Sequence, residues 1–211
     1  KNSDPSDIAV TAAGGLVGEV IQVWRPRELN THETEWGFSC MSYEISGALG
    51  IKMANPDKEV ISFVGDGSYL LNNTDIYSSV ITNNKLIIIV CDNGGFAVIN
   101  RLQLFKGGNE YNNLLKSSNT PGLVDIDFAK HAESMGAKSE HVSSISDLEE
   151  AFKRAKKSKV TYVISIKTHA YQWLEGSAFW DSPTLEVPTT KENKEALRLY
   201  KEGKSKQRQG V

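Results

Sequence analysis

Two short apolar runs, each ending in a glycine-containing turn, restrict the possible fold more than any other feature of this sequence. The first run occupies residues 60–64 and the second residues 86–91. Neither run alternates with polar residues, as is typical of strands buried on both faces of a parallel sheet. Apolar side chains recur at helical spacing within the intervening residues 72–84. Together these segments predict an α/β fold that is doubly wound, with a mostly parallel sheet and helices on both faces.

The remaining segments continue the alternation of strands and helices. Residues 1–175 are expected to form one domain, and residues 176–211 a C-terminal arm with a short helix and a basic tail. Polar residues 25–35 and the Asn- and Gly-rich residues 94–121 are predicted to be loops, the second long enough to be functional. Further strands are expected at residues 7–13, 138–142 and 161–167, and further helices at 16–24, 36–54, 127–135, 146–157 (capped by Ser146) and 191–201.

Composition excludes several classes of function. The 24 basic and 26 acidic residues give a net charge of −2, which offers no electrostatic reason to bind nucleic acid or an anionic membrane. No apolar run approaches the roughly 20 residues that span a bilayer, and no secretory signal is visible. Cys40 and Cys91 are expected to be buried, reduced thiols. We therefore expect a cytoplasmic protein, and the start at Lys1 instead of an initiator Met indicates an excised domain.

The turn after the first apolar run, residues 65–68 (Gly-Asp-Gly-Ser), has the properties of a phosphate site. Glycines between a strand and a helix let backbone N–H groups approach phosphate oxygens. The turn lacks the lysine of the NTPase phosphate loop. A dinucleotide-binding loop is the first alternative, because two of its three glycines are present and Asp92 ends the next strand. Two residues count against it: Leu70 replaces a small residue, and Asp66 would place a carboxylate beside a pyrophosphate.

A divalent cation between Asp66 and the phosphates would remove this repulsion. Mg²⁺ prefers oxygen ligands and is typically held by one or two protein oxygens together with substrate phosphates. Asp66 offers a carboxylate, Asn93 an amide oxygen and Gly95 a backbone carbonyl. One strand–helix–strand return separates Asp66 from Asn93, so both are expected at the same sheet edge. The sequence therefore predicts that the two turns bind a metal diphosphate together.

This pair of turns resembles the thiamine diphosphate motif of the acetolactate synthase and pyruvate decarboxylase superfamily. The motif usually ends in Asn-Asn, whereas here it reads Asp92-Asn93, which retains the metal-binding position. The resemblance covers residues 7–169 and implies thiamine diphosphate and Mg²⁺ as cofactors. It also assigns roles to other residues in the turns. It implies a first diphosphate turn at Gly14 and Gly15, a bulky residue that bends the cofactor at Met41, and cofactor contacts at Gly65, Gly67 and Ser68.

Longer segments resemble the inositol-catabolic branch of this superfamily, the trihydroxycyclohexanedione hydrolases, namely residues 24–26, 30–38, 41–45 and 92–96. The branch implies hydrolysis of a carbon–carbon bond that opens a cyclic dione substrate to an open-chain deoxy-uronic acid. It also implies a pyrimidine-binding domain, on the same or a partner subunit, that carries an activating glutamate. The chain alone is therefore expected to be inert and to hold no catalytic residue, and the full-length protein is expected to be a homodimer or homotetramer.

Several residues and functions stay open at this point. His32 lies just before the cofactor segment and is a candidate for the substrate pocket, whereas the other histidines, including His169, are expected at the surface or in packing. Trp173 and Trp180 are expected to anchor the C-terminal arm. The alternatives are an acetolactate-type lyase or carboligase domain, a non-catalytic domain of the same superfamily, and a dinucleotide-binding oxidoreductase domain.

Overall fold

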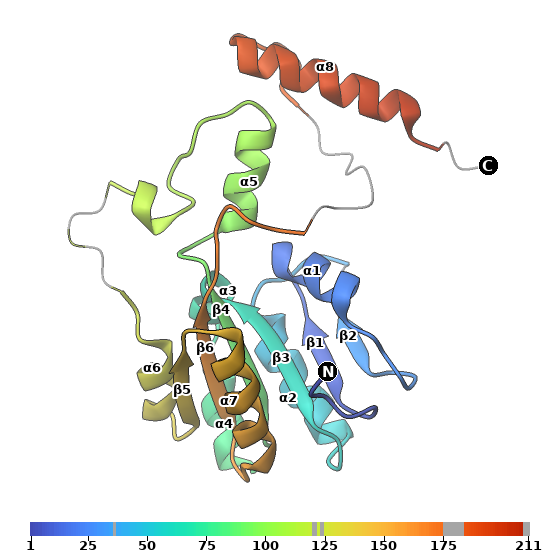
Figure 1. The fold of residues 1–211 in the computed structure, drawn as a ribbon. Helices are drawn as coiled ribbons and strands as arrows, with labels where there is room; N and C mark the ends of the chain where they lie inside the picture. The colour runs from blue at the N-terminus through green and yellow to red at the C-terminus, as the bar shows by residue number, and fades with distance from the viewer. Residues whose placement is uncertain (36, 120–121, 123–124, 175–183, 209–211) are drawn as a thin grey trace.

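A computed structural model describes residues 1–35, 37–119, 122, 125–174 and 184–208. The described chain forms a six-stranded sheet in the order β2-β1-β3-β4-β6-β5, and every pairing is parallel (Figure 1). The strands are β1 (Ile8–Thr11), β2 (His32–Thr34), β3 (Val60–Gly65), β4 (Ile87–Asp92), β5 (Lys138–Val142) and β6 (Tyr162–Lys167). The helices are α1 (Gly15–Val23), α2 (Tyr43–Ala54), α3 (Asp66–Leu71), α4 (Asp75–Ile81), α5 (Ala97–Phe105), α6 (Phe128–Ser134), α7 (Ile145–Lys157) and α8 (Lys191–Lys206), with a 3-10 turn at Leu115–Ser117.

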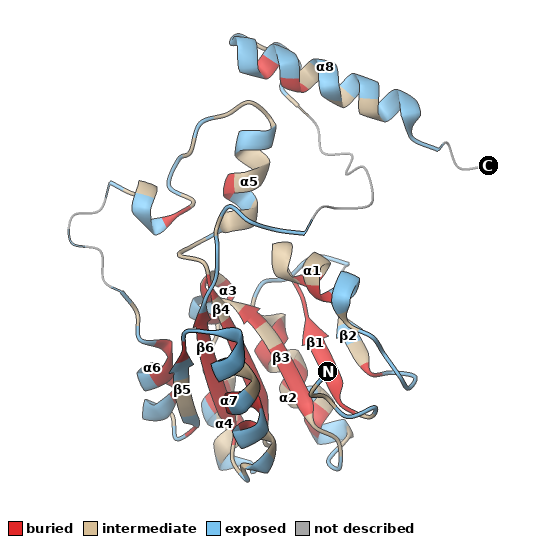
Figure 2. Cartoon of the chain, viewed as in Figure 1, coloured by how far each residue is buried: buried red, intermediate tan, exposed pale blue. Residues whose placement is uncertain are grey.

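Apolar side chains of the central strands point alternately to two hydrophobic cores. On β4, Ile88 and Val90 join one core with α2, α4 and α6, while Ile87 and Ile89 join the other with α7 and Trp24, which follows α1. Burial on both faces explains why β3 and β4 are continuously apolar. Figure 2 shows the buried residues concentrated in the sheet. The predicted doubly wound α/β fold with helices on both faces is confirmed.

The register of β3 and β4 brings the two glycine-containing turns together. Gly65 pairs with Cys91, so Asp66 and Asp92 begin the two turns at the same edge of the sheet. Helix α5 lies above this edge (Figure 1). The fold therefore confirms that both turns lie at one place, as the strand–helix–strand return predicts.

Two segments predicted to be loops contain regular structure. Residues 25–35 include the three-residue edge strand β2, which is too short to show an apolar alternation. Residues 94–121 include α5, whose one fully buried residue is the polar Asn100, so that hydrophobic periodicity gave no signal.

Other predicted boundaries also differ from the structure. The helix expected from residue 36 begins only at Tyr43, because Ser42 has a left-handed backbone conformation with φ of 74°. The helix expected over residues 72–84 is α4, and a separate short helix, α3, precedes it. The prediction of a buried Cys40 is wrong, because this thiol is exposed, and Cys91 is only partly buried.

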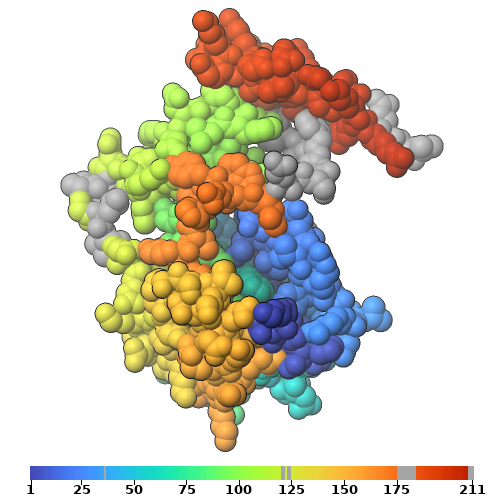
Figure 3. All heavy atoms as spheres, viewed as in Figure 1, coloured from blue at the N-terminus to red at the C-terminus, as the bar shows by residue number. Residues whose placement is uncertain are grey.

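Helix α8 extends five residues beyond its predicted end and lies apart from the sheet, beside α5 (Figures 1 and 3). The start of this helix is docked: Asn193 Nδ2 donates to the carbonyl of Gly107, 2.8 Å away, directly after α5. The approach is close, because a Cβ on Gly107 would lie 2.6 Å from backbone atoms of Glu192. The separate status of residues 176–211 stays a prediction, and Trp180 lies outside the described residues. No helix in the described part combines the length and apolar character needed to cross a membrane.

The cap of α7 provides a test of a corrected prediction. Ser144, not Ser146, is the N-cap, and its Oγ accepts from the backbone N–H of Asp147 at 3.0 Å. Replacing Ser144 by alanine should lower the free energy of unfolding by about 1 kcal/mol. Ser146→Ala is the control, because Ser146 lies inside the first turn of α7. This substitution should change the free energy of unfolding by less than about 0.5 kcal/mol. Urea unfolding of both variants measures this, and equal losses would contradict the assignment.

Candidate functional site

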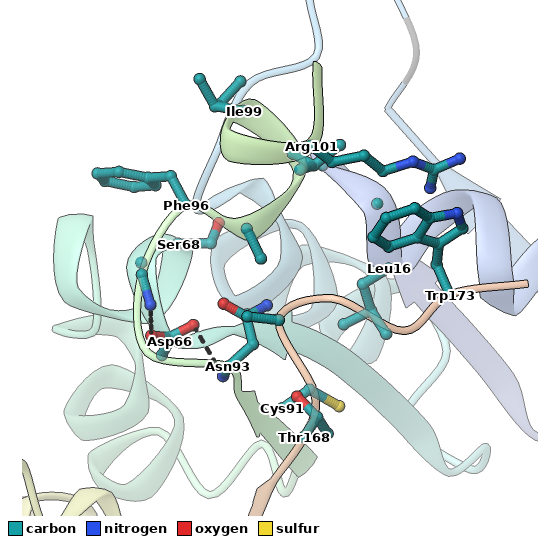
Figure 4. A pocket seen from close by; sticks show the side chains of 18 of the residues that line it. Leu16, Asp66, Ser68, Cys91, Asn93, Phe96, Ile99, Arg101, Thr168 and Trp173 are labelled. Carbon is teal, nitrogen blue, oxygen red and sulfur yellow. Dashed lines mark hydrogen bonds between the residues drawn. The ribbon is translucent and has the colours of Figure 1, made fainter. Parts of the chain in front are cut away.

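A cavity of about 320 Å³ lies at the carboxyl edge of the sheet, beneath α5 (Figure 4). Its walls come from the turns that follow β1, β3, β4 and β6, together with the segment before α2 and the N-terminal part of α5. Such an edge is where ligands bind in open α/β sheets. The predicted site residues that line it are Gly14, Gly15, Met41, Gly65, Asp66, Gly67, Ser68, Asn93 and Gly95.

Asp66 is the buried acid of this cavity, with 4% of its surface exposed. Its Oδ2 accepts from the backbone N–H of Gly95 at 2.7 Å, and its Oδ1 lies 3.5 Å from that of Asn93. Burial, followed by the nearby charge of Asp92, raises the pKa of Asp66 to about 6. The carboxylate therefore lacks a compensating cation among the described residues, and a bound cation would offset the cost of its burial.

Asn93 supplies a second oxygen that has no partner. Its Oδ1 is buried and accepts no hydrogen bond within the described chain. Buried polar atoms are nearly always paired, so an unpaired one requires a specific reason. Asn93 and Asp66 project toward the same part of the cavity (Figure 4). A carboxylate and an unpaired amide oxygen are hard oxygen donors that fit a divalent cation such as Mg²⁺.

Asp92 is not available to a ligand of this cavity. Its Oδ2 pairs with Lys167 Nζ at 2.6 Å, and its Oδ1 accepts from the backbone N–H of Gly94 at 3.0 Å. Asp92 also does not line the cavity. A dinucleotide site would need this acid on a ribose, so the geometry argues against that alternative.

The backbone at Gly95 is held in a conformation that needs glycine. Its φ is +139°, and a Cβ there would lie 2.5 Å from the carbonyl oxygen of Asn113. Residues on either side are fixed by backbone bonds, Phe96 N–H to Asn113 at 2.7 Å and Leu115 N–H to Gly94 at 2.9 Å. The turn that carries Asn93 is therefore rigidly placed opposite Asp66.

The glycines of the other two turns lie against α5. Gly14 has a φ of +91°, which favours glycine, and Val98 lies over both Gly14 and Gly15. A Cβ on Gly67 would lie 2.6 Å from the ring of Phe96. These contacts place both glycine turns around one cavity, as a diphosphate site requires.

The remaining predicted residues have mixed outcomes. Met41 lines the cavity and is about one-third exposed, which leaves a surface for a ligand. His32 lies on β2 and does not line the cavity; its Nε2 is 3.3 Å from Thr34 Oγ1, and burial lowers its pKa. A substrate-pocket role for His32 stays a prediction that this cavity does not support.

Sequence reasoning missed the side of the cavity formed by α5 and the segment after β6. The Cζ atom of the Arg101 guanidinium lies 4.2 Å from the centroid of the Trp173 ring (Figure 4). Both residues line the cavity together with His169 and Glu19. Burial raises the pKa of Glu19, although Arg101 opposes this shift. The i, i+3 spacing of Val98 and Arg101 could have identified this face had α5 been recognised as a helix.

The sequence matches a family of known proteins over most of its length. The family described as "Thiamine pyrophosphate enzyme, C-terminal TPP binding domain" matches residues 12–166. A 3D-(3,5/4)-trihydroxycyclohexane-1,2-dione hydrolase of Bacillus licheniformis is 35% identical over 94% of this chain and 31% of its own length. The hydrolase of the same name from Clostridium tetani is 38% identical over 84% of this chain and 28% of its own length. The chain thus spans about a third of the length of these relatives.

Solved structures of similar fold include two decarboxylases. A thiamine diphosphate-dependent 4-hydroxybenzoylformate decarboxylase of Rhodococcus jostii superposes with a TM-score of 0.67, at 22% identity, over 80% of this chain and 30% of that one. Benzoylformate decarboxylase of Polynucleobacter necessarius gives a TM-score of 0.68, also at 22% identity, over 82% of this chain and 32% of that one. At this identity the similarity supports the fold.

Proposed function

This chain belongs to the thiamine pyrophosphate enzymes as a C-terminal TPP binding domain, and we propose that it holds thiamine diphosphate through Mg²⁺. Asp66 and Asn93 would bind the metal with their side-chain oxygens, and Gly95 with its carbonyl. The metal would in turn bind the diphosphate. The observation that carries this proposal is the buried, unpaired Oδ1 of Asn93 in the same cavity as the buried Asp66.

The cofactor, when bound, supplies the carbanion chemistry that cleaves a carbon–carbon bond next to a carbonyl. This chain's residues would bind and orient it. The backbones of Gly14, Gly15 and Gly67 would hold the diphosphate, and Met41 would support the ring portion, since all four residues line the cavity. The covering helix α5 limits access of water to the cavity. Activation of the cofactor would require a glutamate of a pyrimidine-binding domain, from the same or a partner subunit.

We further propose that the complete protein opens the ring of trihydroxycyclohexane-1,2-dione to 5-deoxy-glucuronate in myo-inositol catabolism, as a cytoplasmic homodimer or homotetramer. Support comes from the relatives, which carry the name of this hydrolase at 35% and 38% identity. The polar wall formed by Arg101, Trp173 and His169 offers hydrogen-bond donors to a polyhydroxylated ring.

Calorimetry tests the cofactor. Thiamine diphosphate should bind this chain in the presence of Mg²⁺ and at least about tenfold more weakly in the presence of EDTA, since the diphosphate would lose its bridge to Asp66. NAD should give no heat of binding at the same concentration. Binding of NAD would contradict the proposal, and so would an affinity for thiamine diphosphate that is the same with Mg²⁺ and with EDTA.

The activity requires a protein that joins this chain to a pyrimidine-binding domain. Such a protein should hydrolyse the cyclic dione faster than it converts pyruvate, whereas the 211-residue chain alone should be inactive on both. Preference for pyruvate would instead indicate an acetolactate-type lyase. Ring opening by the isolated chain would contradict the need for the second domain.

A further inference from the structure

Glu44 carries a buried carboxylate that has no role in the proposed function. It is the second residue of α2, is 1% exposed, and forms no ion pair within the described chain. Removing a carboxylate from water without a cationic partner costs several kcal/mol, on the order of the stability of a small domain. Such a residue needs a compensating set of hydrogen bonds.

Ser68 provides the first of these bonds. Its hydroxyl donates to Glu44 Oε2 at 2.9 Å and accepts from the backbone N–H of Ser42 at 2.5 Å. Ser68 follows the Gly-Asp-Gly turn and is 4% exposed. A serine hydroxyl has one proton to give. Since that proton goes to Glu44, it is not directed at a phosphate in the cavity.

Ser42 connects the same carboxylate to Met41. Ser42 has a φ of 74°, a left-handed conformation that costs a non-glycine residue roughly 1 kcal/mol. Strained residues of this kind persist where surrounding bonds fix them. Here the bond to Ser68 fixes Ser42, and Ser42 directly follows Met41, which lines the cavity.

The turn after β1 lies near the same carboxylate. Burial raises the pKa of Glu44, and the backbone N–H groups of Glu44 itself, Ser42 and Ala13, together with the Ser68 hydroxyl, oppose this shift. Ala13 also lines the cavity and directly precedes Gly14. The Glu44 carboxylate is therefore bonded to the Gly65–Ser68 turn through Ser68, and Ser68 is bonded in turn to the segment that carries Met41.

We infer that Glu44 is a positioning residue whose carboxylate, through Ser68 and Ser42, fixes Met41 relative to the Gly65–Ser68 turn. The contribution of Glu44 to cofactor affinity passes entirely through these bonds. Ser68 then acts as part of the same unit instead of as a separate phosphate ligand. The inference rests on the proposed function only in taking thiamine diphosphate with Mg²⁺ as the ligand.

A double-mutant cycle on this chain tests the inference, with calorimetric titration of thiamine diphosphate plus Mg²⁺. Glu44→Ala and Ser68→Ala should each weaken binding by about tenfold, and the double variant should be no weaker than either, because residues that act as one unit are not additive. Glu44→Gln, which keeps one oxygen to accept from Ser68, should stay within about threefold of the unchanged chain.

Ser62→Ala is the matched control. The Ser62 hydroxyl donates to the backbone carbonyl of Glu44 at 2.8 Å, is fully buried, and does not line the cavity. The substitution should lower the melting temperature without changing cofactor affinity. If instead Ser68 contacts phosphate directly, Ser68→Ala alone should weaken binding and Glu44→Ala should not. That result, or additive losses, would overturn the inference.

A second readout does not depend on the cofactor. Hydrogen exchange at the Ser42 amide should be slow in the unchanged chain and in Ser62→Ala, and faster by about tenfold or more in Glu44→Ala, where Ser68 is released. Equal exchange in all three would overturn the inference. Failure of the unchanged chain to bind thiamine diphosphate would count against the proposed function instead, and the exchange result would still decide the role of Glu44.

Discussion

Replacing Asp66 by asparagine should abolish Mg²⁺-dependent binding of thiamine diphosphate, with a loss of affinity of at least about 100-fold, or roughly 3 kcal/mol. The neutral amide cannot offset the charge of the cation as a carboxylate does. Calorimetry with and without Mg²⁺ measures the effect. Asp57→Asn is the control, because Asp57 is exposed and does not line the cavity. Unchanged affinity in the Asp66→Asn variant would exclude Asp66 as the metal ligand.

The same substitution should change how stability depends on pH. The pKa of Asp66 in the folded chain is raised from 3.8 to about 6. Folding therefore favours the protonated form, so this contribution to stability is complete below the unfolded pKa of 3.8 and is lost as the pH rises through about 6. The loss is on the order of 2–3 kcal/mol. Urea unfolding without cofactor measures this. The free energy of unfolding of the Asp66→Asn variant should lack this decline with rising pH, whereas that of the Asp57→Asn variant should retain it.

Replacing Gly95 by alanine should have the second large effect, because the added Cβ would meet the Asn113 carbonyl at 2.5 Å while φ is +139°. We expect the free energy of unfolding to fall by about 3 kcal/mol or more. Because Asn93 would be displaced, the variant should also bind the cofactor at least about tenfold more weakly. Thermal unfolding and calorimetry measure the two effects.

Gly94→Ala is the matched control for this change. Gly94 also has a positive φ, +79°, but a Cβ there would have no atom within 4 Å among the residues that the structure describes. The substitution should therefore lower the free energy of unfolding only by the cost of holding a residue with a Cβ in the left-handed conformation, roughly 1–2 kcal/mol. Equal losses at the two glycines would show that the contact with Asn113 does not restrain the turn.

The sequence predicted the parts of this molecule whose signal is local. Continuous apolar runs identified β3 and β4, and the Gly-Asp-Gly turn with Asn93 identified the wall of the cavity that carries the acid. Pairing between β3 and β4 then followed from parallel-sheet geometry, because one crossover returns the chain to the same edge.

The parts that were missed depend on contacts between distant segments. Helix α5 buries a polar residue, Asn100, whose Nδ2 donates to Glu110 at 3.0 Å, so no apolar stripe reveals the helix. Arg101 and Trp173 meet only in the folded chain. Glu44 has the spacing of an ordinary first-turn helix residue, and only its burial distinguishes it.

The two edge strands of the sheet, β2 and β5, are poorly suited to pair with another molecule. An open sheet leaves unpaired backbone groups on its outer strands, which can recruit strands of another molecule. Here β2 is only three residues long, and β5 carries Lys138, Glu140 and His141, with Glu140 paired to Arg154 at 2.6 Å. Short and charged outer strands oppose edge-to-edge growth and aggregation. If the complete protein assembles as we propose, its contacts should therefore use helical surfaces, and the six-stranded sheet of the described residues should not be extended.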